Sequence, residues 1–133
     1  MNSIYKYFST DEVTKWQLDP ELWAMLDEAR EKAGVPFIIT SGKRTTDQNS
    51  CLLGAVADSS HLKGLGVDLA TGDDHIFNRI IYGLCMAGLG DRWGEYKLRD
   101  PTDGSKLVHH HIHVDCDKTL PKEVTWAMME QNG

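Results

Sequence analysis

The sequence lacks long hydrophobic runs, a basic excess and paired cysteines, and each absence excludes a class of protein. No run approaches the roughly 20 consecutive apolar residues of a membrane-spanning helix, so we expect no membrane insertion. The N-terminal stretch MNSIYKYFSTDEVTKW contains no apolar segment of the kind found in secretory signal peptides. We therefore expect the protein to be cytoplasmic on synthesis and to remain there unless another factor releases it.

Positive charge is scarce, with 14 Lys and Arg against 20 Asp and Glu and a formal net charge of -6. Domains that bind nucleic acids usually carry a basic excess or a basic stripe. Here the basic residues are scattered along the chain, so we expect no nucleic-acid partner.

The three cysteines, Cys51, Cys85 and Cys116, are odd in number and widely spaced, and they form no C-x-x-C pair. This pattern argues against a disulfide framework and against a thiolate zinc site. We interpret all three as small, reduced residues of the core.

The chain has the size and composition of one ordinary globular domain. It has 133 residues, of which 41% are hydrophobic and 26% are charged, close to the average for globular proteins. No internal repeat, low-complexity tract or linker divides it. We therefore expect residues 1–133 to form a single domain, with a monomer as the default state.

Four segments carry helix signals. Ser9 and Glu12 have the spacing of a capping box, and Asp19 followed by Pro20 is a typical helix start. Asp73 or Asp74 can cap a third helix, and the fourth segment, LPKEVTWAMMEQ, begins next to a proline. The predicted helices cover residues 10–16, 20–33, 74–87 and 120–131.

Four other segments are short and apolar or alternate in polarity, which predicts strands. They are PFIITS (36–41), GVDLA (66–70), GDRWGEYKL (90–98) and KLVHHHIHVD (106–115). Residues 41–60 are polar and predict a loop, and DPTDG (100–104) predicts a turn. Together these elements predict an α+β domain, in which a small antiparallel sheet is flanked by helices.

The clearest strand segment, VHHHIHVD, separates two kinds of side chain because residues alternate between the faces of a strand. One face is mostly apolar and predicts contact with the core. The other carries an imidazole row that ends in a carboxylate, which predicts the lining of a cleft. The apolar face comprises Val108, His110, Ile112 and Val114, and the polar face comprises His109, His111, His113 and Asp115.

A second stretch, SSHLKGLGVDLA, provides His61 and Asp68 on either side of two glycines that allow a tight backbone path. Hydrolytic zinc sites commonly use three nitrogen or oxygen ligands and leave one position for water. His61, Asp68 and one histidine of the imidazole row would supply such a set, although the spacing does not choose among His109, His111 and His113. A second histidine nearby could act as a general base or stabilise an oxyanion.

Both stretches resemble the motifs of one enzyme family, the zinc D-alanyl-D-alanine carboxypeptidases. SSHLKGLGVDLA resembles their S-x-H-x-x-G-x-x-x-D signature, HIHVD resembles their H-x-H segment, and ITSGKRTTDQN resembles their SG-x-R stretch. The start of the chain, KYFSTDEV followed by LDPELWAMLDEARE, resembles compact phage and bacterial members. The resemblance covers nearly the whole chain and implies a hedgehog/DD-peptidase fold.

The resemblance also implies a role for individual residues. His61, Asp68 and His113 would hold Zn²⁺, and His111 would be the catalytic histidine beside it. Three further residues would serve the substrate: Arg44 would bind a carboxylate as a charge-assisted pair, Gln48 would assist it, and Ser59 would order the loop.

Three other positions bear on the site without being assigned to it. Asp115 is interpreted either as a partner that orients a histidine or as a cap at the end of its strand. Lys43 stands where the family often has an aromatic residue, and Val67 replaces a usual small residue. Both departures concern the wall of the cleft, and therefore the specificity.

The function implied by the resemblance is a zinc metallopeptidase that hydrolyses peptide bonds in the stem peptides or crosslinks of bacterial peptidoglycan. A small single domain without a signal is typical of a phage endolysin, which would reach the wall after release through a permeabilised host membrane. The sequence leaves the cleaved bond open among D-Ala-D-Ala, a crosslink and L-Ala-D-Glu.

Two other functions stay open. One is a zinc-stabilised, catalytically inactive module that binds the cell wall, against which His111 argues. The other is an HNH-type nuclease, because VHHHI resembles its first metal-binding segment. That site needs a following helix with further ligands, and no histidine follows Asp115.

Overall fold

The structure is a computed structural model that describes residues 4–43, 60–100, 102–104, 107–121 and 123–129. Arg44, Gln48 and Ser59, which the resemblance assigns to the substrate, lie outside these residues, as does Cys51.

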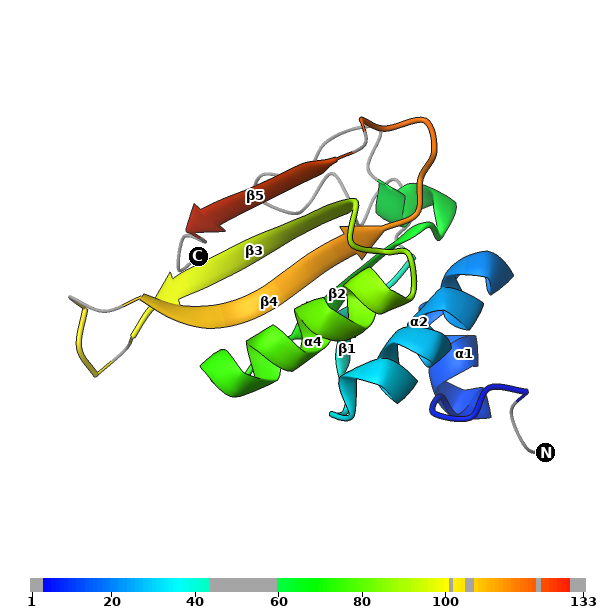
Figure 1. Ribbon diagram of the computed structural model, residues 1–133, viewed down its shortest axis with the longest axis horizontal. Coiled ribbons are helices and arrows are strands. Elements are labelled where there is room, and N and C mark those ends of the chain that lie inside the picture. Colours follow the sequence, from blue (N-terminus) through cyan, green and yellow to red (C-terminus); the bar gives the residue numbers. More distant parts are fainter. Residues whose placement is uncertain (1–3, 44–59, 101, 105–106, 122, 130–133) are drawn as a thin grey trace.

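The described residues form an α+β fold in which three α-helices accompany one five-stranded sheet (Figure 1). The elements in chain order are α1 (Thr10–Trp16), α2 (Pro20–Ala33), β1 (Ile39–Ser41), the 3-10 turn η1 (Ser60–Lys63), β2 (Gly66–Ala70), α4 (Asp74–Met86), β3 (Arg92–Arg99), β4 (Leu107–Asp115) and β5 (Val124–Met129).

The three helices begin where the sequence predicts. Ser9 and Glu12 form the capping box of α1. The carboxylates of Asp19 and Asp73 accept hydrogen bonds from backbone amides in the first turns of α2 and α4. These caps satisfy amides that have no partner within a helix. None of the described helices is long and apolar enough to cross a membrane.

The sheet is mixed, whereas the sequence predicts an antiparallel one. Its strand order is β1-β2-β4-β3-β5. The β1/β2, β2/β4 and β3/β4 pairs are antiparallel, but β5 pairs with β3 in parallel. The site described below lies on the central strand β4, on its neighbours β2 and β3, and on the turn η1.

The helix predicted over residues 120–131 is wrong, because Val124–Met129 forms strand β5. Pro121 precedes the strand, and its carbonyl oxygen accepts a hydrogen bond from the guanidinium of Arg92. Thr125 and Ala127 are exposed while Trp126 is half-buried, which is the two-residue period of a strand at a sheet edge. The tertiary pairing with β3 therefore outweighs the local helix signal of the proline.

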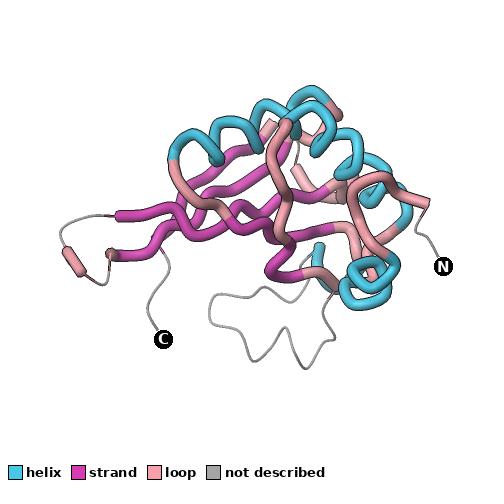
Figure 2. Tube along the Cα trace, turned by 90° about the horizontal axis from the view of Figure 1, so that it is seen from below, coloured by secondary structure: helices cyan, strands magenta, loops and turns pink. Residues whose placement is uncertain are grey.

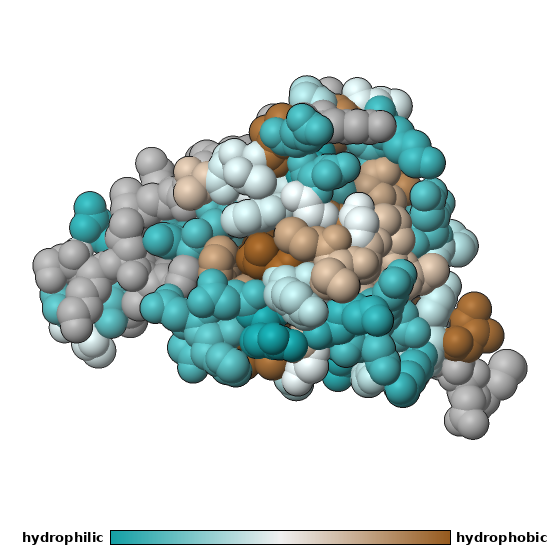
Figure 3. Space-filling model, in the orientation of Figure 1, coloured by the Kyte–Doolittle hydropathy of each residue, from teal (hydrophilic) through white to brown (hydrophobic). Residues whose placement is uncertain are grey.

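The core lies between one face of the sheet and the helices α2 and α4, which lie together on that side (Figures 1 and 2). Figure 3 shows this helical side of the molecule, where hydrophilic residues dominate the outer surface of the helices. The apolar side chains of the helices and of the inner face of the sheet meet in this core, and the fully buried ones include Leu22, Trp23, Leu26, Val67, Leu69, Ile80, Leu84, Ile112 and Val114.

Helices α2 and α4 approach each other closely at Gly83. A Cβ atom on Gly83 would lie 2.3 Å from the carbonyl oxygen of Ala29 and 2.7 Å from the Cβ of Ala33. Both distances are below van der Waals contact, so only a glycine allows this approach of the two backbones. The packing of the helical layer therefore depends on a residue without a side chain.

The prediction that the cysteines lie in the core is wrong for Cys85, whereas Cys116 packs against the core. Cys85 and Cys116 are both free thiols, but Cys85 is exposed and Cys116 is only half-buried. Cys85 follows the buried residues Gly83 and Leu84 of α4 and points away from the apolar stripe.

Cys116 is expected to react slowly with iodoacetamide. Burial, together with the negative charges of Glu21, Asp19 and Asp115, raises its pKa to about 11. At pH 8.5 the thiolate fraction is then about 0.3%, against roughly half for an ordinary cysteine. The thiolate of a more basic thiol is about tenfold more nucleophilic, which offsets part of the loss in thiolate fraction. We therefore expect alkylation about tenfold slower than for an ordinary thiol.

Timed alkylation followed by peptide mass spectrometry measures this rate, with the exposed Cys85 as the internal comparison. Because the pKa is raised, the Cys116 rate should keep increasing with pH up to at least pH 10. Equal rates for the two thiols at pH 8.5 would contradict the burial of Cys116.

Candidate metal centre

Strand β4 alternates as the sequence predicts in its second half. Ile112 and Val114 are fully buried beneath the helices, whereas His111 and His113 are half-buried on the opposite face. His110 departs from the predicted apolar face because it is exposed. The side chain of His109 lies outside the described part of the structure.

The sheet brings Asp68 to His113. In the antiparallel pairing of β2 with β4, Asp68 lies opposite His113, and Ala70 lies opposite His111. Val67 and Leu69, on either side of Asp68, are buried in the core, so the carboxylate points to the other face. Its Oδ1 lies 3.0 Å from Nδ1 of His113.

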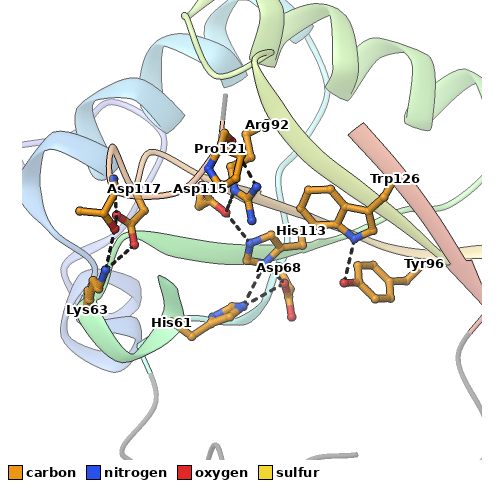
Figure 4. Close-up of polar contacts among 11 residues, drawn as sticks. His61, Lys63, Asp68, Arg92, Tyr96, His113, Asp115, Asp117, Pro121 and Trp126 are labelled. Atoms are coloured by element: carbon orange, nitrogen blue, oxygen red, sulfur yellow. Dashed lines mark hydrogen bonds and ion pairs between the residues drawn. The ribbon is translucent and has the colours of Figure 1, made fainter. Parts of the chain in front are cut away.

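His61 reaches the same point from the 3-10 turn η1 (Figure 4). Its Nε2 lies 3.2 Å from Oδ1 of Asp68 and 3.1 Å from Nδ1 of His113. Its side chain is almost fully buried. Within the residues that the structure describes, this triple is the one group of three or more ligand-type side chains that could hold a metal ion.

The geometry of the triple suits a zinc ion. The three facing atoms, two imidazole nitrogens and one carboxylate oxygen, are 3.0 to 3.2 Å apart. Tetrahedral zinc with bonds of about 2.0 to 2.2 Å separates its ligand atoms by roughly 3.3 to 3.6 Å. A change of a few tenths of an ångström would therefore accommodate the ion.

Each histidine of the triple has its second nitrogen fixed by an acceptor. The carbonyl oxygen of Gly42 accepts a hydrogen bond from Nδ1 of His61 at 2.7 Å. The carboxylate of Asp115 accepts one from Nε2 of His113 at 2.9 Å. Because both acceptors require an N–H, the other two nitrogens face the centre, where each can donate a proton to Asp68 in the metal-free protein or present a lone pair to a bound ion.

The negative charge of Asp68 favours a cation at this site. Burial raises the pKa of Asp68, but hydrogen bonds from His113 and His61 and their positive charge outweigh burial and hold the pKa well below its usual range. Burial lowers the pKa of His113, and its hydrogen bonds to Asp115 and Asp68 outweigh that effect and raise it. Asp68 is therefore ionised at neutral pH and supplies a fixed negative charge.

Asp115 is itself held by Arg92, a residue that the sequence analysis missed. The Nε of Arg92 donates to Oδ2 of Asp115 at 3.0 Å, and the Asp115 side chain is fully buried. Since the same oxygen accepts from His113, Asp115 orients this histidine, which agrees with the first of its two interpretations. No spacing rule connects Arg92 to Asp115, because β3 and β4 bring them together only in the folded sheet.

The turn that carries His61 is anchored on both sides. Gly64 has a positive φ of 71°, and its carbonyl oxygen accepts a hydrogen bond from the amide of Asp19. The ammonium of Lys63 lies 2.8 Å from the buried carboxylate of Asp117. Burial raises the pKa of Asp117, but the hydrogen bonds from Lys63 and Thr119 and the charge of Lys63 together outweigh burial and lower the pKa. These contacts fix the position of His61.

His111 lies beside the triple rather than within it. Its Nε2 is 3.8 Å from Oδ2 of Asp68, and its ring stacks on that of Tyr96 with centroids 4.5 Å apart. The imidazole of His111 thus lies near the candidate metal centre but is not one of its three ligand-type side chains. This placement is compatible with proton transfer at Nε2.

Strands β3 and β5 add two aromatic residues to this face, Tyr96 and Trp126, which the sequence analysis did not assign to the site. The indole of Trp126 lies 5.9 Å from the His113 ring, centroid to centroid. Its Nε1 donates a hydrogen bond to the hydroxyl of Tyr96 at 3.0 Å. The sequence analysis missed Trp126 because it predicted a helix for residues 120–131. The alternating pattern in VTWAMM could have indicated the strand.

One family model, described as Peptidase M15, matches residues 6–115 of the chain. No curated protein matches the chain. The matched range contains the whole triple and His111, and it ends before β5. Peptidases of this family depend on zinc, which agrees with the donor set of the triple. Since the match spans most of the chain, the protein belongs to the peptidase M15 family of zinc metallopeptidases.

Proposed function

We propose that this metallopeptidase hydrolyses peptide bonds of bacterial peptidoglycan, with His61, Asp68 and His113 as its zinc ligands and His111 as its catalytic histidine. The single observation that carries the proposal is the compact triple with a half-buried imidazole 3.8 Å from its carboxylate. Three protein ligands of this kind are typical of catalytic zinc, which keeps a position for water.

Zinc held by the triple would supply a Lewis acid and an activated water. The protein supplies the rest. Asp115 and the carbonyl of Gly42 keep the two ligand histidines in orientation. His111 would accept a proton at Nε2 as the nucleophile attacks and return it to the leaving amine.

The choice of peptidoglycan rests on the motif resemblance. The signature from Ser59 to Asp68 and the H-x-H segment are those of carboxypeptidases that cut D-alanyl-D-alanine. In the proposed enzyme Arg44 binds a carboxylate of the stem peptide, with Gln48 and Ser59 nearby in the sequence. The hedgehog/DD-peptidase fold, the endolysin role and action of a monomer at the cell wall belong to the same proposal.

The other two functions are less well supported. The nuclease site needs a ligand-bearing helix after its first metal-binding segment, and the element that follows β4 within the described residues is the strand β5. A wall-binding module without turnover would have no use for an imidazole beside the triple, yet His111 is held there by stacking on Tyr96.

Muropeptide mass spectrometry, with release of new amino groups measured in parallel, tests the proposal. The zinc-loaded protein should release amino groups from purified peptidoglycan and should yield shortened or uncrosslinked stem peptides. The masses also identify the cleaved bond. Binding to peptidoglycan without release by the zinc-loaded protein would favour the inactive module instead.

Chelation of the metal is expected to abolish the activity but to lower stability only in part. The reason is that the core lies on the face of the sheet opposite the triple, so the buried apolar residues stay packed without an ion. Far-ultraviolet circular dichroism before and after treatment with EDTA measures this. Complete unfolding on chelation would show that the fold depends on the ion.

A further inference from the structure

Tyr96 lies next to His111 on the open face of the sheet. The two residues are directly opposite each other in the β3/β4 pairing, and their rings stack at 4.5 Å with an angle of 10° between their planes. Both side chains are half-buried. The phenol is therefore held at the edge of the proposed active site by the histidine that would act there.

The hydrogen bond from Trp126 determines how the Tyr96 hydroxyl is used. An indole N–H can only donate, so the phenol oxygen is the acceptor in this 3.0 Å contact. The phenolic proton must then point elsewhere, and none of the described residues accepts it. Figure 4 shows the hydroxyl end of Tyr96 directed toward the side on which His113 and Asp68 lie.

Trp126 is fixed by its surroundings. It lies opposite Gly94 in the parallel β3/β5 pairing, and a Cβ atom on Gly94 would lie 2.1 Å from Cε2 of the indole. The ring thus lies directly on the backbone of β3. The guanidinium of Arg92 lies over it, 5.0 Å from the centroid. This position leaves the indole N–H little freedom except toward Tyr96.

We propose that the hydroxyl of Tyr96 donates a hydrogen bond to the carbonyl oxygen of the scissile peptide bond as negative charge develops on it, and that Trp126 is the positioning residue that directs this donor. The inference rests on the proposed function of the triple. The phenolic proton stays on Tyr96 throughout, so no further reactant is needed. A donor aimed in advance at developing charge lowers the barrier without reorganisation.

The positioning residue lies outside the range that the family model matches. Trp126 lies in β5, beyond the matched residues 6–115. The zinc ligands and His111 lie within that range. Trp126 acts on the reaction through Tyr96 alone and has no contact with the substrate in this scheme.

Steady-state kinetics of three variants on a peptidoglycan stem peptide tests the proposal. Tyr96→Phe removes only the hydroxyl and should lower kcat by about 100-fold with little change in KM, the size expected for one oxyanion donor. Trp126→Phe keeps an aromatic ring but removes the N–H, and should lower kcat by about threefold to tenfold, the size of one neutral hydrogen bond. The double variant should be no slower than Tyr96→Phe, because Trp126 acts through the hydroxyl.

Controls separate this role from a merely structural one. Thr125→Ala changes an exposed neighbour in β5 and should leave kcat unchanged. All variants should retain one equivalent of zinc and the thermal unfolding midpoint of the parent within a few degrees. Equal kcat for Tyr96→Phe and the parent, or losses in the two single variants that multiply in the double variant, would overturn the proposal.

A binding measurement distinguishes failure of this inference from failure of the proposed function. Calorimetric titration with a phosphinate analogue of D-Ala-D-Ala, which mimics the charged carbonyl centre, should show affinity lowered at least tenfold in Tyr96→Phe. If the parent protein binds the analogue and hydrolyses the stem peptide but Tyr96→Phe does both equally well, only the role of Tyr96 is lost. If the parent protein does neither, the proposed function fails and this inference fails with it.

Discussion

Replacement of His113 by alanine is expected to abolish zinc binding and peptidoglycan hydrolysis while the fold persists. The variant keeps only two of the three ligand atoms that lie 3.0 to 3.2 Å apart. Loss of an outer partner of a metal site typically costs 10- to 100-fold in affinity or activity, and loss of a ligand costs more. We therefore expect kcat/KM to fall by at least about 100-fold, with zinc content well below one equivalent by elemental analysis.

The exposed His75 in α4 provides a matched control. His75→Ala removes an imidazole that is remote from the triple and should keep both the zinc and the activity. Circular dichroism should give the same spectrum for both variants, because His113 points away from the core. Unchanged muropeptide products from His113→Ala would remove this residue from the mechanism.

Replacement of Gly83 by alanine is expected to destabilise the protein by about 2 kcal/mol. The new methyl group would meet the carbonyl oxygen of Ala29 at 2.3 Å, and a backbone atom in a helix cannot rotate away. Overpacking of a core typically costs about 1 to 3 kcal/mol, and the upper end applies against a rigid backbone. The higher helix propensity of alanine offsets about 1 kcal/mol of this destabilisation.

Urea unfolding measures this effect. With a slope of about 2 kcal/mol per molar for a domain of this size, the midpoint should fall by about 1 M. Gly104→Ala is the matched control, since a Cβ atom there meets nothing within 4 Å, and its effect should stay within about 0.5 kcal/mol. Equal midpoints for the two variants would show that the α2/α4 contact is looser than described.

The sequence could predict those parts of the site that depend only on residues close together in the chain. The alternation of β4 places His111 and His113 on one face whatever the strand pairs with. The short segment from His61 to Asp68 contains its own turn, which Gly64 makes possible with a positive φ. Resemblance to a family then chose among the histidines, which spacing alone did not.

The missed parts depend on contacts between strands that are distant in the sequence. Arg92 reaches Asp115 only because β3 lies beside β4. Trp126 reaches Tyr96 only because β5 pairs with β3 in parallel, whereas Pro121 favours a helix start at this position. The register and the order of the strands depend on the whole sheet, so no short stretch of the sequence could indicate them.

The parallel pairing of β5 has a consequence for the boundaries of the folding unit. A fragment cut after Asp115 would contain every residue of the triple and the full range that the family model matches. It would also leave β3 as an exposed edge strand, with unpaired amides and carbonyls along one side. The guanidinium of Arg92 would lose its contact with the indole of Trp126. Exposed edge strands pair with strands from other molecules, so the shortened chain should self-associate although it keeps all three residues of the triple.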